Sequence, residues 1–305
     1  MNNKTVVIDA SSISYAAFHT TGHLSYNNMQ TGIIYGFVRR LLSMAIKFET
    51  TDFIFCWDDH ITHRHKDYPE YKQKRKKVKE KDMEEDPAYE QAIKSLRAQM
   101  ILLKFQCLPT MGFMNNFLLE LYEADDLLAH WAKKLAGGRE VIMVTSDADM
   151  YQCLDYCRIW CPMKKKYFTK KMFVEKYGIQ PDQWAMAKAI GGCDGDGVIG
   201  IAGVADPKKE TSKALKYLQG KLPNGKIKSR IESDKGQAII KRNLPIVTAP
   251  YQEELMGKMI KRRNRFSKKG FIKVFDSLHF KSLLANENFS KWEKTFLKEA
   301  EDGRS

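Results

Sequence analysis

Acidic residues recur at one kind of place in the sequence, directly after short apolar runs. The runs and the acids that follow them are residues 6–8 with Asp9, 53–57 with Asp58, 117–122 with Glu123 and 141–144 with Asp147. Each run is typical of a buried strand, and the carboxyl ends of parallel strands share one rim of a sheet. Carboxylates gathered at a rim repel one another unless a cation neutralises them. Oxygen donors without histidine or cysteine favour Mg²⁺ or Mn²⁺, so the pattern predicts a magnesium-type site.

Further acids extend this set. They are Asp125, Asp126, Asp149, Asp194 and Asp196. One aspartate after a strand is usually only the N-cap of the next helix. Four strand ends together with two double-acid motifs are harder to explain in that way. An acidic site of this kind is suited to metal-assisted cleavage of a phosphodiester.

Charge and composition narrow the class of protein. The 305 residues carry 51 Lys and Arg against 37 Asp and Glu, a formal net charge of +14 that favours a polyanionic partner. No apolar run approaches the roughly 18 residues of a membrane span, and the first residues lack a signal-peptide pattern. The six cysteines form no Cys-x-x-Cys pair, which indicates reduced thiols and a cytoplasmic location. A membrane protein and a secreted protein are therefore disfavoured.

The elements that must position the acids alternate along the chain. Helical spacing of apolar residues covers 31–48, 88–105 and 127–135, between the strand-like runs. This order predicts an α/β fold with a central, mainly parallel sheet and helices on both faces, followed by a mostly helical C-terminal region. We expect a first domain over 1–180, with a dense basic segment at about 60–90, and a second over 181–305.

Five motifs, in order, resemble the flap-endonuclease/5′-nuclease superfamily. They are Val7-Ile8-Asp9-Ala10-Ser11-Ser12, Trp57-Asp58, Glu123-Ala124-Asp125-Asp126, Thr145-Ser146-Asp147-Ala148-Asp149 and the segment 196–204. The resemblance spans roughly residues 5–220 and is greatest to the stand-alone bacteriophage 5′→3′ exonucleases of the RNase H type. It implies a PIN-like nuclease core.

The resemblance also implies roles for individual residues. A first metal site would use Asp9, Asp58, Glu123 and Asp125, with Asp126 beside them, and a second would draw on Asp147, Asp149 and Asp196. Basic residues of a helical arch, Arg64, Lys72 and Arg75, would act on the reacting phosphate, where a cation offsets developing charge. Two or more Mg²⁺ ions, replaceable by Mn²⁺, would serve as cofactors.

DNA contacts are expected in two further places. In the rest of the arch they are Lys74, Lys76 and Lys77. After Asp196 the chain resembles a helix-hairpin-helix element that grips duplex backbone with a bound K⁺, and there they are Gly200, Gly203, Lys208 and Lys209. Glycines permit close approach to a phosphate, and a helix N-terminus adds its dipole.

One position departs from the family pattern. Where the family has Asp-x-x-Asp ending at Asp196, the first position is Cys193, and Asp194 comes one residue later. Either Asp194 takes the place of the missing ligand, or this metal site has one ligand fewer.

The resemblance implies a Mg²⁺-dependent 5′→3′ exonuclease with structure-specific flap endonuclease activity on DNA and RNA–DNA hybrid, removing primers or displaced 5′ strands in replication. Its partners would be DNA with a 5′ flap, a nick or an RNA primer, and a single-stranded-DNA-binding protein or other replication machinery. We expect a monomer without membrane contact, in the host cytoplasm if the protein is of phage origin. The alternatives are a catalytically impaired, nuclease-like DNA-binding protein and a single-stranded RNA nuclease with a related metal site.

Overall fold

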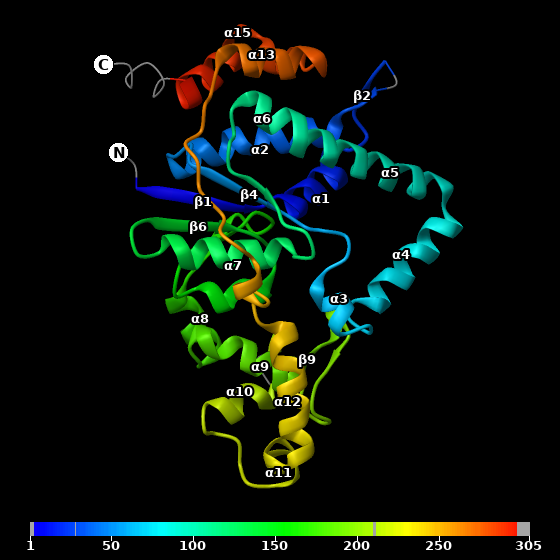
Figure 1. Ribbon diagram of the computed structural model, residues 1–305, viewed down its shortest axis with the longest axis vertical. Coiled ribbons are helices and arrows are strands. Elements are labelled where there is room, and N and C mark those ends of the chain that lie inside the picture. Colours follow the sequence, from blue (N-terminus) through cyan, green and yellow to red (C-terminus); the bar gives the residue numbers. More distant parts are fainter. Residues whose placement is uncertain (1–2, 28, 210–211, 298–305) are drawn as a thin grey trace. The chain divides into compact units, whose positions relative to one another are not determined.

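The computed structural model describes residues 3–27, 29–209 and 212–297 (Figure 1). The chain divides into two compact units, each built from segments that are far apart in the sequence. The first contains residues 1–57, 86–117 and 258–305, and the second contains residues 58–85 and 118–257. Among the described residues, no helix is both long and apolar enough to cross a membrane. The division at residue 180 expected from the sequence stays a prediction.

The first unit is built around two parallel strands, β1 (Lys4–Asp9) and β4 (Phe53–Trp57), in the register Ile8↔Phe55. Strand β5 (Asn116–Leu118) neighbours β4. Its other elements are α1 (Ala10–Thr21), β2 (Ser25–Tyr26), β3 (Met29–Gln30), α2 (Gly32–Phe48), α5 (Pro87–Leu102), the π-helix η1 (Leu103–Cys107), α6 (Leu108–Met111), α13 (Lys268–Ser277), α14 (Lys281–Leu284), α15 (Asn286–Trp292) and the π-helix η6 (Glu293–Leu297). Residues 53–57 are fully buried, as a strand covered on both faces requires.

An aromatic cluster fixes the C-terminal helices within this unit. Phe271 of α13 lies 5.4 Å from Trp292 of α15 and 5.5 Å from Phe296, measured between ring centroids. Phe113, which precedes β5, makes an edge contact with Phe296 at 5.6 Å. Such rings bury large apolar areas, so residues 268–297 belong to the core of this unit although they are last in the sequence.

The second unit contains a parallel pair, β6 (Glu140–Val144) with β7 (Arg158–Cys161), and an antiparallel strand β8 (Lys166–Phe168) beside β7. A short hairpin follows, β9 (Gly192–Cys193) and β10 (Val198–Ile199). Its helices are α3 (His63–Asp67), α4 (Gln73–Glu85), α7 (Ala124–Leu135), η2 (Ala148–Cys153), α8 (Lys170–Tyr177), η3 (Pro181–Gln183), α9 (Trp184–Gly191), η4 (Asp194–Asp196), α10 (Lys213–Leu218), α11 (Lys226–Glu232), α12 (Asp234–Val247) and η5 (Glu253–Leu255).

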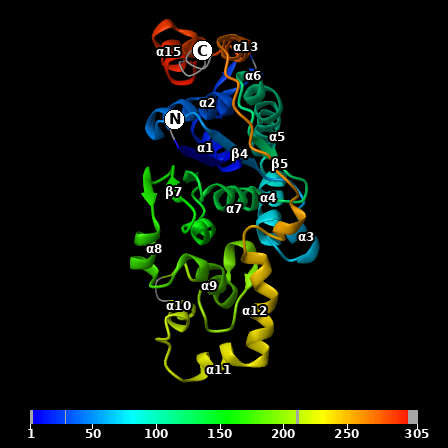
Figure 2. The same cartoon turned by 60° about the vertical axis from the view of Figure 1, so that its left-hand side comes forward.

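A second apolar core holds α9, α10 and α12 together around the hairpin (Figure 2). Ala189 and Ile190 of α9 and Ile240 of α12 contribute to it. The fully buried Asn243 of α12 donates hydrogen bonds to the carbonyls of Ala189 (3.0 Å) and Ile199 (2.9 Å). A buried amide with both partners satisfied fixes the hairpin to these two helices.

The expected fold class is confirmed. The central sheet is mixed and mostly parallel, helices cover it, and the described part of the chain after residue 200 is helical apart from loops. All six cysteines are free, as expected.

One expected strand is wrong in part. The apolar run at 117–122 predicted a strand that leads directly into Glu123, but β5 ends at Leu118. Leu121 has φ 68°, a left-handed conformation that no strand continues through. The N–H of Leu121 donates to Asp59 Oδ2 at 2.8 Å, and that of Tyr122 donates to the Leu119 carbonyl at 3.2 Å. A tight turn therefore separates β5 from the acids that follow.

Candidate metal and phosphate site

Acids from three separate segments of the second unit line one small cavity. It measures about 20 Å³, and its carboxylates are Glu123, Asp125, Asp149 and Asp196. That volume is enough for one water-sized species. Of the acids expected from the sequence to converge, these four line the cavity, whereas Asp9, Asp58 and Asp147 are not among its lining residues.

Glu123 is the most strongly held acid of the cavity. It is the N-cap of α7 and is 6% exposed. Its carboxylate accepts hydrogen bonds from Lys72 Nζ at 2.7 Å and from the Tyr71 hydroxyl at 3.1 Å, and Arg64 lies 3.4 Å away. Burial alone would raise the pKa of Glu123, but the positive charges of Lys72 and Arg64 outweigh it and lower that pKa. Glu123 is thus held ionised.

Arg64 is buried, with 4% exposure, rather than displayed on an arch. Its Nε and NH2 groups donate to the carbonyls of Ile246 and Thr248, both at 2.8 Å. Its two terminal nitrogens form a bidentate pair with Asp126, both contacts at 2.7 Å, and NH1 also reaches Glu123. These contacts use all five N–H donors of the guanidinium group. The catalytic role expected for Arg64 stays a prediction that this geometry does not favour.

Asp126 is engaged in the same way. It is 1% exposed, and besides Arg64 it accepts the backbone N–H groups of Glu123 (3.1 Å) and Tyr251 (2.8 Å). Because both of its oxygens are satisfied by protein donors, the structure favours a positioning role over metal ligation.

Lys72 connects two groups of acids. Its side chain holds Glu123, while its backbone N–H donates to the carbonyl of Asp196 at 2.8 Å. Its φ of 55° is left-handed, which is uncommon outside glycine and asparagine. Arg75, also expected to act on phosphate, is 57% exposed at its side chain and lies 3.3 Å from Asp196 Oδ1. Both cations therefore lie beside the acids, and their action on a reacting phosphate stays a prediction.

Asp58 and Asp9 are not among the acids that line the cavity. Asp58 is exposed, and its Oδ1 accepts the N–H of Ala124 at 2.9 Å, which places it at the start of α7. Asp9 belongs to the first unit, where it caps α1 by accepting the N–H of Ser12 at 2.8 Å. Its participation in the metal site stays a prediction.

A second group of acids follows β6. Asp147 caps η2 by accepting the N–H of Asp149 at 2.8 Å, and burial together with the negative charge of Asp149 raises the pKa of Asp147. Asp149 contacts the ammonium of the fully buried Lys188, and Lys208 lies 3.1 Å from its Oδ1. Burial opposes the ionisation of Asp149, yet these two lysines outweigh it and lower its pKa. Protein cations thus offset this carboxylate.

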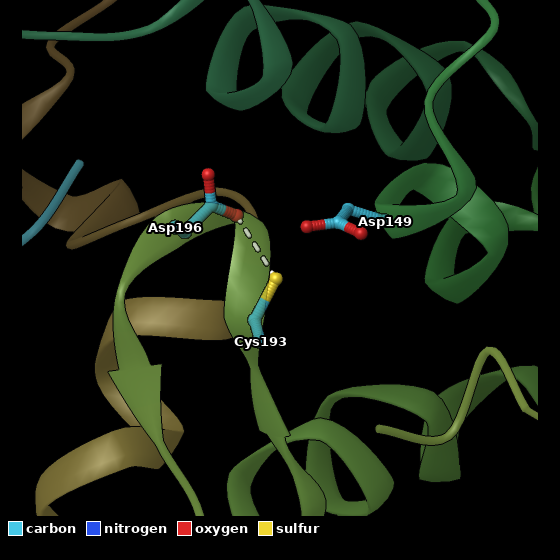
Figure 3. Close-up of side chains that lie close together, drawn as sticks. All are labelled: Asp149, Cys193 and Asp196. Atoms are coloured by element: carbon cyan, nitrogen blue, oxygen red, sulfur yellow. Dashed lines mark hydrogen bonds between the residues drawn. The ribbon is translucent and has the colours of Figure 1, made fainter. Parts of the chain in front are cut away.

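Cys193, not Asp194, joins the second group. The Oδ atoms of Asp149 and Asp196 and the Sγ of Cys193 lie within 4.8 Å of one another (Figure 3). Asp194 is exposed in the short helix η4 and is not part of this cluster. Of the two alternatives left open by the sequence, the structure does not support replacement of the missing ligand by Asp194.

Of the residues expected to contact DNA, the lysines are exposed, and the two glycines lie where the backbone is sharply turned or closely packed. Lys74, Lys76 and Lys77 are exposed on α4. Gly203 has φ 84°, and a Cβ on Gly200 would overlap the backbone of Gly191. Lys209 is exposed, and Lys208 is 40% exposed at its side chain while it pairs with Asp149. Contact of these residues with DNA, and a K⁺ ion at the hairpin, stay predictions.

Sequence reasoning missed Lys188. A signal was present, since this lysine stands in the otherwise apolar stretch Trp184-Ala185-Met186-Ala187-Lys188-Ala189-Ile190. A charged residue within a buried helix needs an opposite charge, and an unused acid nearby is the natural partner.

Comparisons with known proteins identify the family of this chain. Residues 4–178 match the family described as 5′-3′ exonuclease, N-terminal resolvase-like domain. A 5′-3′ exonuclease of Aquifex aeolicus is 32% identical over 217 residues, which is 69% of this chain and 68% of that protein. DNA polymerase I of Bacillus subtilis is 26% identical over 298 residues, covering 92% of this chain but only 32% of the polymerase. The chain therefore spans about a third of the length of that polymerase.

Solved structures share the fold. The structure of T5 5′-exonuclease with bound zinc has a TM-score of 0.67 at 19% identity and covers 91% of this chain and 98% of that one. The T5 D15 flap endonuclease complex with DNA and metal ions has a TM-score of 0.62 at 19% identity, covering 98% and 99%. On the match over residues 4–178 and the Aquifex aeolicus relative, this chain is a nuclease that belongs to the 5′-3′ exonuclease family.

Proposed function

We propose that this chain is a Mg²⁺-dependent 5′→3′ exonuclease with flap endonuclease activity on DNA and RNA–DNA hybrid, and that it removes primers or displaced 5′ strands in replication. One observation carries the proposal: four carboxylates line a single cavity, with a lysine ammonium 2.7 Å from one of them. Family membership supports the exonuclease reaction, and the D15 structure with DNA and metal ions supports a nucleic acid substrate for the relative.

The residues of the cavity fit a divalent cation. Carboxylate oxygens are the donors that Mg²⁺ and Mn²⁺ take, and Glu123 and Asp125 present them where α7 begins. Tyr71 and Arg64 hold Glu123, which lines the cavity, in one orientation. When bound, such a cation would neutralise the scissile phosphate and supply an activated water.

The chain's own cations complete the site. Lys72 lies beside Glu123 and Arg75 beside Asp196, so each cation is held next to a cavity carboxylate and could exchange it for an incoming phosphate. A cation preorganised beside the reacting phosphorus stabilises developing negative charge. The exposed lysines of α4 would then hold the rest of the strand by neutralising its phosphates.

Other features remain part of the proposal. We propose that the substrate is DNA with a 5′ flap, a nick or an RNA primer, that replication proteins such as a single-stranded-DNA-binding protein recruit the enzyme, and that it acts as a cytoplasmic monomer. The overall charge of +14 supports the nucleic acid partner.

The decisive experiment uses a 5′-labelled flap DNA and an RNA-primed duplex with wild type, Asp125→Asn and Glu120→Gln. Glu120 is exposed and does not line the cavity, which makes it a matched control. We expect 5′ products in Mg²⁺ from wild type and from Glu120→Gln, none from Asp125→Asn, and none from any variant in EDTA. Wild type that binds the flap without cutting it in either Mg²⁺ or Mn²⁺ would instead establish a catalytically impaired DNA-binding protein.

A further inference from the structure

The Cys193 thiol lies inside a group of carboxylates. Its Sγ–H donates to Asp196 Oδ2 at 3.1 Å, and Asp149 faces the pair from the opposite side (Figure 3). Cys193 is 1% exposed. Its direction is fixed by the hairpin, because Gly192 before it has φ 83° and pairs with Ile199 across the two strands. The thiol is therefore held toward the acids by backbone geometry.

Asp196 shows that this group is short of a cation. The residue is 8% exposed, and its Oδ1 has no hydrogen-bond partner among the described residues. The largely exposed guanidinium of Arg75 lies 3.3 Å from that oxygen. A buried carboxylate oxygen without a hydrogen bond is costly, and a metal ion would satisfy it.

The donor set of Asp149, Asp196 and Cys193 differs from that of Glu123 and Asp125 in the same cavity, because it includes a sulfur. Mg²⁺ takes oxygen ligands, whereas Zn²⁺, Co²⁺ and Cd²⁺ accept thiolate sulfur together with carboxylate oxygen. One sulfur and two carboxylates supply three protein ligands, which leaves a fourth position open, as in catalytic zinc sites. On binding, the thiol proton now shared with Asp196 would pass to solvent, because the thiolate is the ligand.

Two lysines compete with a metal at Asp149. Lys188 is fully buried and contacts Oδ2, while Lys208 is 40% exposed at its side chain and lies 3.1 Å from Oδ1. Lys208 can therefore turn into solvent and release Oδ1, and Lys188 remains in place.

We propose that Asp149, Cys193 and Asp196 form a mixed sulfur–oxygen metal site that selects a zinc-type divalent cation over Mg²⁺. This proposal rests on the proposed function, because the metal would serve the nuclease reaction. It adds that the second site binds a different class of metal from the first.

Cobalt(II) titration of the reduced, metal-free chain tests the proposal without any cleavage assay. Ligation by Cys193 gives a sulfur-to-cobalt charge-transfer band in the near ultraviolet, which carboxylates alone cannot produce. We expect wild type to show the band, Zn²⁺ to abolish it and a large excess of Mg²⁺ to leave it in place. Cys161→Ser, which removes another thiol of the same unit, should retain the band.

Two variants of the cluster complete the test. Cys193→Ser and Cys193→Asp should both lose the band, with folding confirmed by circular dichroism. Asp196→Asn should weaken cobalt binding while Cys193 is intact. Absence of the band in wild type, or its persistence in Cys193→Ser, overturns the proposal. A band in a chain that never cleaves the flap would instead overturn the proposed function and leave the metal site standing.

Discussion

The two groups of acids in the second unit neutralise their charge in different ways. Around Glu123, every charged contact is made by a buried or half-buried side chain, and Arg64 uses all its donors there. Around Asp149, one lysine is buried and another is partly exposed, and Asp196 keeps an oxygen without a hydrogen bond among the described residues. We infer that the first group forms a rigid framework, whereas the second can exchange one of its cations for another.

The largest expected effect follows from Arg64. Arg64→Ala leaves Asp126 buried without its guanidinium partner, and breaking a buried pair on one side costs about 3–5 kcal/mol. Lys188→Met should cost clearly less, because Asp149 keeps Lys208. Urea unfolding of both variants, with equal m-values, measures the difference. Equal losses would show that the two groups are equally rigid.

Lys72→Ala should affect catalysis more than stability. Loss of one preorganised cation beside the reacting phosphate lowers kcat about 10²–10³-fold. Lys208→Ala, at the other group, should reduce kcat much less, since Lys208 pairs with Asp149 rather than Glu123. Single-turnover rates and flap binding, measured separately, check both. A Lys72→Ala variant whose binding falls as far as its kcat would make Lys72 part of the guiding surface.

The pH dependence of stability should differ in sign between Glu123 of the first group and Asp147 of the second. The pKa of Glu123 is lowered, so its stabilisation is complete above its ordinary value of 4.5 and is lost as the pH falls below it. The pKa of Asp147 is raised, so ionising it costs stability as the pH rises above its ordinary value of 3.8. In EDTA, Glu123→Gln should flatten the acid limb of the unfolding free energy.

Asp147→Asn provides the matched comparison, because asparagine preserves the cap on η2. This variant should gain stability modestly at neutral pH in EDTA. A loss of stability there would contradict the raised pKa.

The smallest effect concerns the exposed lysines of α4. Changing Lys74, Lys76 and Lys77 together to alanine should weaken flap binding and reduce the slope of log affinity against log salt by up to about 0.9 for each phosphate that is no longer neutralised. The exposed Lys164, Lys165 and Lys166, changed in the same way, serve as a control surface. An unchanged slope in the α4 variant would exclude phosphate binding by those lysines.

The sequence predicted the strands and the acids that follow them well, because apolar runs ending in a carboxylate are local signals. β1, β4 and β6 lie where the runs placed them. Long-range contacts were not predictable in this way. Arg64 is buried because carbonyls about 180 residues later, at Ile246 and Thr248, accept its N–H groups. No spacing in the sequence shows such partners.

The local backbone conformation was also not predictable from the sequence at two places. Apolar character alone extended a strand to Tyr122, although Leu121 adopts a left-handed turn that the Asp59 carboxylate stabilises. At Cys193 the substitution was visible, but only the hairpin geometry shows that the thiol, and not Asp194, points toward Asp149.

The unusual backbone of Lys72 has a consequence for communication inside the second unit. The backbone N–H of Lys72 donates to the Asp196 carbonyl at 2.8 Å, and its Nζ donates to Glu123 Oε1 at 2.7 Å. Tension applied to the segment ahead of α4 is therefore transmitted at once to the Glu123 carboxylate and to the main chain of Asp196. Substitutions at Lys72 and Glu123 should accordingly be non-additive, a thermodynamic coupling that a double-mutant cycle would reveal.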